Sequence, residues 1–302
     1  MYYYTIYGLH IQSDIEIEAF QEVEQFASND EIYRIESAEV NFKGYKFIDD
    51  FVIREQTNHG FLYVIKDVVA FLITENRMKV FPLIDNRKVW QSYLIGGAMS
   101  IILVQMGCFL LHGSAVQSNE SAYLFLGLSG VGKSSLAAGL DQLGFNIITD
   151  DICAISKSDK DLYISAGTKQ VRLLKDAVKL LNIKNVLPLD HPTAQPKFGY
   201  NFPRKPTEYK TKVVKIVELV VDEKMEEEIE MERIDSFGKI KLLKANFYKE
   251  DLAKTLKAHA LNFQFMMLSA KGIECFRIKR KHKNYELNSL IEFVQQRIIR
   301  ND

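Results

Sequence analysis

The chain has 302 residues, of which 47% are hydrophobic and 26% are charged, a composition typical of a globular protein with an apolar core. Its 39 Lys and Arg residues balance its 39 Asp and Glu residues, so no net positive field exists to attract nucleic acid or an anionic membrane. Three widely separated cysteines exclude a disulfide framework and a Cys-x-x-Cys metal site, and reduced thiols are typical of a cytoplasmic protein.

Residues 1–87 are expected to form a smaller α+β domain that is rich in strands. Tyr2–Tyr7 has the aromatic composition of a strand, and the apolar runs Leu62–Ile65 and Val68–Leu72 indicate a hairpin. The acidic stretch Asp14–Phe26 is compatible with both helix and strand. No catalytic set of residues occurs in this region, which therefore suggests a structural or substrate-docking domain.

The second domain is expected to span residues 88–302 and to open with a buried helix at about 88–106. Tyr93–Leu111 is almost uncharged and about as long as the roughly 20 residues of a membrane-spanning helix. Ser100 and Gln105 interrupt this run, so a buried helix that leads into a buried strand explains the sequence better.

A hairpin, a helix and a strand are expected next. Phe109–Gln117 and Ala122–Gly127 are apolar segments separated by turn residues. Lys133–Leu143 has the apolar spacing of a helix, which Gly144 is placed to end. Phe145–Thr149 is a short apolar run, and it predicts a strand that ends before two aspartates.

The rest of the chain is expected to alternate between helices and strands. Cys275–His282 has the composition of a basic strand at a sheet edge, and 185–212 is expected to be a loop segment because it holds five of the six prolines. The other expected elements are helices at Val171–Leu181, Leu252–Met267 and Leu287–Ile299 and strands at Val213–Asp222 and Glu226–Ile234.

Gly127–Ser134 fits the phosphate-loop pattern G-x-x-x-x-G-K-[ST], with a predicted strand before it and a predicted helix after it. Its glycines allow backbone N–H groups to point toward phosphates, and the helix adds the positive end of its dipole. Lys133 would supply a catalytic charge to the β- and γ-phosphates, and the Ser134 hydroxyl could ligate Mg²⁺. The sequence therefore predicts ATP and Mg²⁺ as ligands. The expected nucleotide contacts are Gly127, Ser129, Gly130, Val131, Gly132, Lys133, Ser134 and Ser135.

Asp150 and Asp151 follow the predicted strand Phe145–Thr149. A helical crossover precedes that strand, so it should run parallel to Ala122–Leu126 and end at the same sheet edge as the phosphate loop. Adjacent residues of a strand point to opposite sides, which predicts separate roles. We expect Asp150 to be the base that accepts the hydroxyl proton and Asp151 to be a metal ligand with Ser134, although the sequence does not fix the order of the two roles.

His112 falls opposite Gly127 in the predicted hairpin, at the mouth of the phosphate loop. There it could contact the phosphates or orient an aspartate. The alternative is a hydrogen-bonded histidine of the core, which is common on an apolar strand.

In their order and spacing, His112-Gly113, the loop Gly127–Ser134 and Asp150-Asp151 resemble the HPr kinase/phosphorylase family. The resemblance implies an α/β fold with a P-loop kinase core of the HPr kinase and phosphoenolpyruvate carboxykinase type, a mixed sheet flanked by helices. It also implies phosphorylation of a protein serine, with the first aspartate as the base. Members often form oligomers, so a homo-oligomer is compatible with the resemblance.

The chain departs from the family downstream of the paired acids. The Glu-Ile-Arg-Gly stretch associated with phosphorolysis is absent, and a nearer stretch places Lys169 and Arg172 where they could contact substrate or phosphate. Arg204 belongs to a basic loop near the prolines, which is either a further phosphate or substrate contact or an exposed solubilising loop.

The opening segments Tyr4–Leu9 and Asp14–Glu18 are more similar to the smaller HPr-kinase-like proteins encoded with ribosomal peptide products. Some of those phosphorylate a terminal serine of a lasso-peptide precursor. The resemblance therefore implies a peptide or small protein bearing a serine as the partner.

Three functions remain open from the sequence. The first is a serine kinase that acts on a peptide or small protein, and the second is a regulatory module that hydrolyses ATP slowly. The third is a kinase of a small molecule such as free serine or a sugar. The paired acids favour the first over the second, and the N-terminal domain argues against the third because a small acceptor needs no docking surface.

Overall fold

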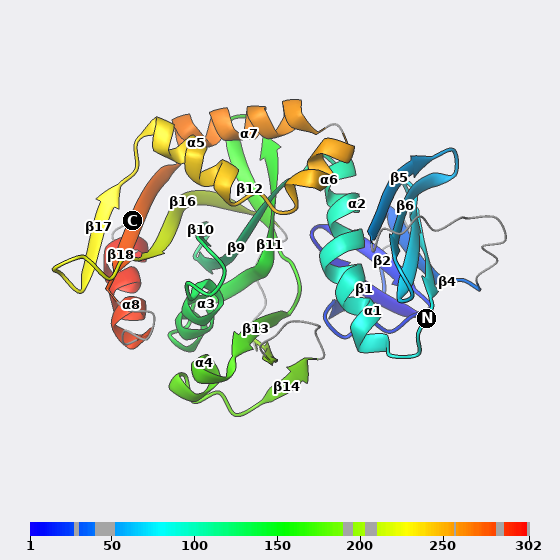
Figure 1. The fold of residues 1–302 in the computed structure, drawn as a ribbon, viewed down its shortest axis with the longest axis horizontal. Helices are drawn as coiled ribbons and strands as arrows, with labels where there is room; N and C mark the ends of the chain where they lie inside the picture. Colours follow the sequence, from blue (N-terminus) through cyan, green and yellow to red (C-terminus); the bar gives the residue numbers. More distant parts are fainter. Residues whose placement is uncertain are drawn as a thin grey trace.

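A computed structural model of the chain describes residues 1–26, 30–39, 52–189, 196–202, 210–256, 258–281 and 287–300. The fold is mixed α/β, with an eight-stranded, a seven-stranded and a three-stranded sheet and with helices between and around them (Figure 1). Arg204, a predicted contact of the site, lies outside the described residues, as does part of the predicted loop segment at 185–212.

The eight-stranded sheet is formed by the strands β1 to β8 and has the order β3-β1-β2-β4-β8-β7-β6-β5. Its strands β6 and β7 form the hairpin predicted from the two apolar runs. Asp14–Phe26 contains the two-residue strand β3 and no helix. One reason is that the Ile17 N–H donates to the Tyr4 hydroxyl (2.8 Å), a donor that a helix would use internally. The strands are β1 (Tyr2–Ile6), β2 (Leu9–Ser13), β3 (Gln21–Glu22), β4 (Ile32–Ser37), β5 (Val52–Thr57), β6 (Gly60–Ile65), β7 (Val69–Ile73) and β8 (Arg77–Pro82).

A helical segment runs between the two large sheets (Figure 1). It begins with α1 (Arg87–Tyr93), continues through the π-helical turn η1 (Leu94–Ala98) and ends with α2 (Met99–Gln105). The buried helix predicted at about 88–106 is thereby confirmed, and the strand β9 follows it. No helix among the described residues is long and apolar enough to cross a membrane.

The seven-stranded sheet has the order β10-β9-β11-β12-β16-β18-β17, and β10 also pairs with β16 in parallel. The hairpin predicted before the phosphate loop corresponds to β9 and β10. A third, small sheet has the order β13-β15-β14. The strands are β9 (Phe109–Ser118), β10 (Ser121–Leu126), β11 (Asn146–Ser158), β12 (Asp161–Ser165), β13 (Gln170–Leu174), β14 (Val186–Leu189), β15 (Lys197–Asn201), β16 (Lys210–Val221), β17 (Ile229–Arg233) and β18 (Glu274–Arg280).

The strand predicted at Phe145–Thr149 is longer than expected. β11 continues through both aspartates because it remains paired with β9 as far as Ile155, with an irregularity between Ile147 and Thr149, and its pairing with β12 extends it to Ser158. β11 is antiparallel to β9, and β9 is antiparallel to β10, so β11 runs in the same direction as β10 with one strand between them. The expected direction is therefore correct, whereas the expected strand end is wrong.

Three further predictions need correction. Val171–Leu181 is not one helix, because its first part pairs with β15 as the strand β13 and only α4 (Lys175–Leu180) is helical. β18 is not an edge strand, since it lies between β16 and β17. The helix predicted at Leu252–Met267 is divided, because α6 ends at Thr255 and α7 begins at His259. The helix α5 (Ser236–Ala245) had no predicted counterpart. The remaining helices are α3 (Lys133–Gln142), α6 (Glu250–Thr255), α7 (His259–Gly272), α8 (Leu287–Val294) and the π-helical η2 (Gln295–Ile299).

The first sheet packs directly against the part of the chain that carries the phosphate loop. Its apolar core includes Leu110 of β9 and Ile152 of β11. Two backbone hydrogen bonds add to this contact, from Tyr7 N–H to the Ala166 carbonyl (2.6 Å) and from Lys169 N–H to the Ala19 carbonyl (3.0 Å). The division of the chain into one domain of residues 1–87 and a second of residues 88–302 stays a prediction.

Gly97→Ala is expected to lower the free energy of unfolding by about 1–3 kcal/mol, the usual cost of overpacking a core. A Cβ at Gly97 in η1 would lie 2.4 Å from the ring of Tyr63, which is buried in β6. Gly272→Ala is the matched control, because a Cβ there meets nothing within 4 Å. Urea unfolding should show a lower midpoint for Gly97→Ala alone, and a midpoint equal to that of the wild type would contradict this packing.

Candidate active site

The phosphate-loop sequence joins the end of β10 to the start of α3. Gly127 (φ 136°), Gly130 (φ 82°) and Gly132 (φ 98°) all have left-handed backbone angles that favour glycine. At Gly127 a side chain is also excluded by space, because a Cβ would lie 2.5 Å from the carbonyl oxygen of Leu219. Gly132 is the residue before α3, so the free N–H groups of the first helical turn face the loop.

Two buried cations hold the loop in shape. Lys133 Nζ donates to the carbonyls of Gly127 (2.8 Å) and Leu128 (3.1 Å), and burial lowers its pKa while the nearby carboxylates oppose that shift. Arg280, at the end of β18, donates from Nη2 to the carbonyl of Val131 (2.7 Å). In this conformation the amine of Lys133 therefore lies inside the loop and binds two of its backbone carbonyls.

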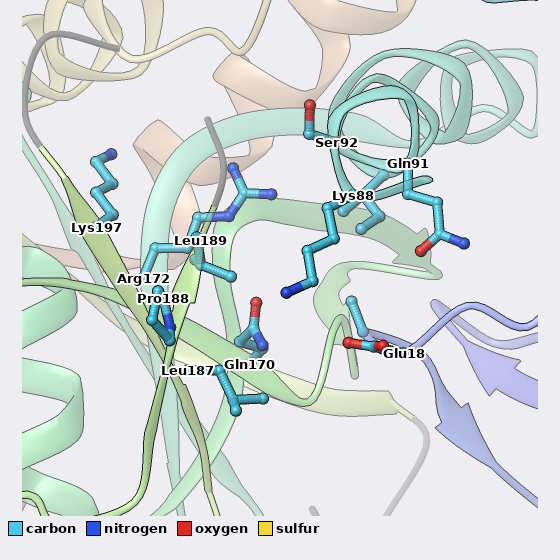
Figure 2. A pocket seen from close by; sticks show the side chains of 12 residues that line it. Glu18, Lys88, Gln91, Ser92, Gln170, Arg172, Leu187, Pro188, Leu189 and Lys197 are labelled. Atoms are coloured by element: carbon cyan, nitrogen blue, oxygen red, sulfur yellow. The ribbon is translucent and has the colours of Figure 1, made fainter. Parts of the chain in front are cut away.

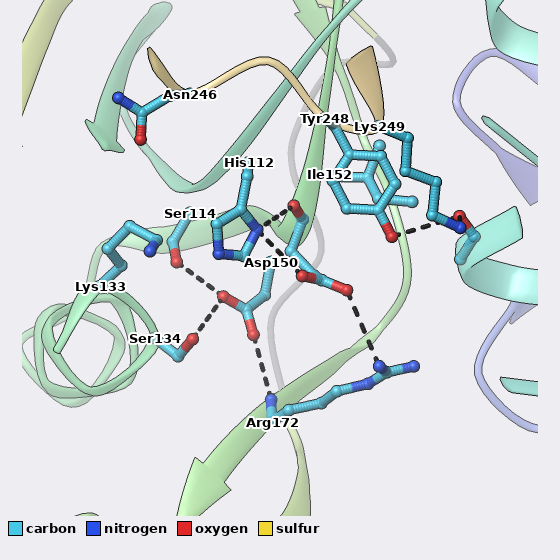
Figure 3. Close-up of polar contacts among 12 residues, drawn as sticks. His112, Ser114, Lys133, Ser134, Asp150, Ile152, Arg172, Asn246, Tyr248 and Lys249 are labelled. Atoms are coloured by element: carbon cyan, nitrogen blue, oxygen red, sulfur yellow. Dashed lines mark hydrogen bonds and ion pairs between the residues drawn. The ribbon is translucent and has the colours of Figure 1, made fainter. Parts of the chain in front are cut away.

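Asp150 is buried and fully engaged by hydrogen bonds. Its Oδ1 accepts from the hydroxyls of Ser114 (2.6 Å) and Ser134 (2.8 Å), and its Oδ2 accepts from the Arg172 backbone N–H (3.1 Å), as Figure 3 shows. Burial raises the pKa of this carboxyl despite these donors. The Ser134 contact joins the acid directly to the hydroxyl that phosphate loops use to bind Mg²⁺.

Asp151 has the opposite electrostatic environment. His112 Nδ1 lies 3.1 Å from its Oδ1 and 3.2 Å from its carbonyl oxygen, and Arg172 Nη1 lies 3.7 Å from its Oδ2. Burial raises the pKa of Asp151, but the hydrogen bond from His112 and the charge of Arg172 outweigh it and lower the pKa to about 2. Because both neighbours of Nδ1 are acceptors, Nδ1 carries the proton.

The register of β9 and β11 sets these positions. Asp150 lies opposite Ser114 and Asp151 lies opposite Gly113. The expectation that the two carboxylates would point to opposite sides is wrong, since both line one pocket. The physical reason is the left-handed backbone at Asp151 (φ 73°), which breaks the alternation of the strand.

The pocket encloses about 770 Å³, including the solvent at its mouth. Most of the predicted site residues line it, whereas Gly127 and Val131 shape the loop behind it. Lys169 does not line it. The predicted residues on its wall are His112, Ser129, Gly130, Gly132, Lys133, Ser134, Ser135, Asp150, Asp151 and Arg172.

Two residues of the site carry no signal in the sequence. Lys197 of β15 lines the pocket although it is remote from the motifs. Asn246, which follows α5, joins the two strands of the hairpin at their ends. Its side-chain oxygen accepts from Gly127 N–H (2.9 Å), and its carbonyl accepts from His112 N–H (2.8 Å). Only the three-dimensional fold brings these residues to the loop.

Comparison with known proteins adds little about function. No protein-family model matches the sequence, and no curated protein matches it. Among solved structures, the Hpr(Ser) kinase/phosphatase from Coxiella burnetii matches with a TM-score of 0.32 and 15% identity, over 64% of this chain and 97% of that chain. A similarity at this level says nothing about activity or substrate, so function has to be inferred from the site itself.

Asp151→Asn is expected to weaken the acid dependence of stability. The folded state keeps this carboxylate ionised down to about pH 2, whereas the ordinary value is 3.8. Its contribution is therefore fully present above about pH 4 and is lost as pH falls through about 2. With a side chain 31% exposed, we expect about 1–2 kcal/mol.

Urea unfolding between pH 2 and pH 6 measures this effect. Asn tolerates the left-handed backbone at this position, so the substitution should not strain the strand. Asp159→Asn, in the turn after β11, is the matched control and should retain the pH dependence of the wild type. An unchanged pH dependence in Asp151→Asn would contradict the assigned contacts.

Proposed function

We propose that this protein is a serine kinase, which transfers the γ-phosphoryl group of ATP to a serine hydroxyl of a peptide or small protein with the help of Mg²⁺. The observation that carries this proposal is the hydrogen bond of 2.8 Å between Ser134 of the phosphate loop and Asp150 of β11. It places a carboxylate beside the hydroxyl that a nucleotide-bound metal would use, and a second carboxylate follows in the chain.

The residues of the pocket fit a nucleotide with its metal. The loop offers backbone N–H groups, and Lys133 would exchange its two carbonyl partners for phosphate oxygens. The described residues contain no cluster of three or more His, Cys, Asp or Glu side chains that could hold a metal. The Ser134 hydroxyl and a carboxylate beside it fit Mg²⁺, which typically takes one or two protein ligands and completes its shell with substrate phosphates and water. Ser134 and Asp150 would hold Mg²⁺, which when bound would neutralise the negative charge that develops during transfer.

The sequence led us to expect Asp150 as the base and Asp151 as the metal ligand, and the contacts favour the reverse assignment. Asp150 is 5% exposed and uses both oxygens within the protein, one of them on Ser134. It is therefore suited to hold a metal-bound water rather than to meet an acceptor. The side chain of Asp151 is 31% exposed and faces the pocket. We assign the metal side to Asp150 and the proton-accepting role to Asp151.

The low pKa of Asp151 is compatible with that role. In a loose phosphoryl-transfer transition state, the hydroxyl loses its proton only as the new P–O bond forms, so a weak base suffices. The hydroxyl oxygen bonds to phosphorus, the bond to the leaving ADP oxygen breaks, and Asp151 takes the proton. His112 holds Asp151 through Nδ1, while the other edge of its ring faces the side of the pocket with Ser114 and Lys133 (Figure 3).

Lys133→Ala is expected to abolish transfer, because no other side chain of the loop carries a positive charge. The assay incubates the protein with Mg²⁺-ATP and a panel of HPr, serine peptides, free serine and sugars, and detects the added phosphoryl group by mass spectrometry. A phosphoryl group added to a peptide or protein would support the proposal. Gain on free serine or a sugar alone would identify a small-molecule kinase, and ATP hydrolysis without any phosphorylated acceptor would identify a regulatory ATPase.

The two aspartates should respond differently to the metal. Asp151→Asn is expected to lower kcat by about 10²–10⁴-fold at every Mg²⁺ concentration, the usual contribution of an acid or base. Asp150→Asn is expected to raise the Mg²⁺ concentration needed for half-maximal rate, with partial recovery at high Mg²⁺. Asp159→Asn serves as the control. The opposite pattern, with recovery in Asp151→Asn alone, would restore the assignment made from the sequence.

A further inference from the structure

A second hollow opens beside the phosphate pocket (Figure 2). It lies among the Glu18–Ala19 segment, the helix α1 and the small sheet β13-β15-β14, and it encloses about 710 Å³ including the solvent at its mouth. Since the segment between β2 and β3, the helical segment and the small sheet each supply a wall, this hollow exists only because the N-terminal part of the chain packs against the rest.

The hollow and the phosphate pocket share two residues, Arg172 and Lys197. Arg172 is the closer link to the chemistry. Its backbone N–H donates to Asp150 (3.1 Å), and its guanidinium lies 3.7 Å from the carboxylate of Asp151. A molecule that contacts Arg172 in the hollow would therefore be separated by one side chain from the carboxylate that we assign as the base.

The polar lining of the hollow has an excess of positive charge. Lys88, Arg172 and Lys197 line it together with a single acid, Glu18, and Arg172 is also paired with Asp151 of the phosphate pocket. Within the described part of the chain, the amines of Lys88 and Lys197 make no hydrogen bond or ion pair. Cations without a partner at the wall of a hollow attract an anionic ligand, and the attraction is strongest where water is partly excluded.

Part of the hollow's wall is apolar, and it lies on the strand that pairs with that of Lys197. It is formed by Leu187, Pro188 and Leu189 of the edge strand β14, and Leu187 is 50% exposed. A ligand that fills this hollow would therefore need an apolar group as well as a negative charge.

We propose that this hollow is the acceptor site and that Lys88 and Lys197 select a serine acceptor with a carboxylate close to the hydroxyl and an apolar residue beside it. This inference rests on the proposed kinase function and adds the chemical class of its acceptor. The carboxylate can come from an acidic side chain or from a chain end, and both offer the same oxygen atoms to the two lysines.

Three short peptides test the proposal, each with leucine before a single serine. In the first, aspartate follows the serine and the chain end is amidated; in the second, asparagine replaces the aspartate. The third ends in the serine with a free carboxylate. Calorimetry should give a Kd about tenfold lower for the first or the third peptide than for the second, the typical effect of a charge-assisted contact. Which of the two binds tighter identifies the source of the carboxylate.

Lys88→Gln/Lys197→Gln is expected to bring the charged and neutral peptides to within about twofold of each other, because the charged contact contributes about one factor of ten. Lys88→Gln alone, on the exposed side of α1, should give a partial loss. Lys184→Gln is the matched control, since Lys184 is exposed and is not among the residues that line either pocket. Equal affinity of the wild type for all three peptides, absence of binding, or a preference that survives in the double variant would overturn the proposal.

The only tryptophan, Trp90, locates the binding event. It lies in α1 next to Gln91, which lines the hollow, so peptide binding should change its fluorescence. A carboxylate preference without any phosphorylated product would refute the kinase function and leave the binding site, whereas phosphorylation without that preference would refute the binding site alone.

Discussion

The hydrogen bond between Ser134 and Asp150 is the contact on which the rest of the site depends. It joins the first turn of α3 to β11, the strand that follows this helix in the chain. The same carboxylate is held by Ser114 of β9 and by the backbone of Arg172 in β13. One buried acid thus fixes the phosphate loop, the strands β9 and β11 and the small sheet relative to one another.

The surroundings of the two adjacent aspartates shift their pKa values in opposite directions. Burial raises the pKa of Asp150, whereas His112 and Arg172 lower that of Asp151 against its own burial. A buried carboxylate with a raised pKa is costly to keep ionised, and a nearby divalent cation would remove that cost. This contrast explains why neighbouring residues of the same type can serve different purposes, in the manner of other sites in which environment separates two carboxyl groups.

The local parts of the site were predictable from the sequence, and the long-range parts were not. The pattern Gly127–Ser134, the β9–β10 hairpin and the nearness of the acids follow from short-range spacing. The length of β11 and the strand β13 depend on pairing with β9 and β15, which no local pattern reveals. Asn246 and Lys197 reach the site from distant segments, and the left-handed angle at Asp151 reversed the expected separation of the carboxylates.

The central claim is that the phosphate loop and Asp150 together form one site for a nucleotide and its metal. A crystal structure with Mn²⁺ in place of Mg²⁺ and a non-hydrolysable ATP analogue tests it most directly, because the anomalous scattering of manganese locates the ion. The account predicts a manganese peak bound to Ser134 Oγ, with Asp150 reaching it directly or through one water molecule. A nucleotide bound outside the loop, or an ion that neither Ser134 nor Asp150 contacts, would contradict it.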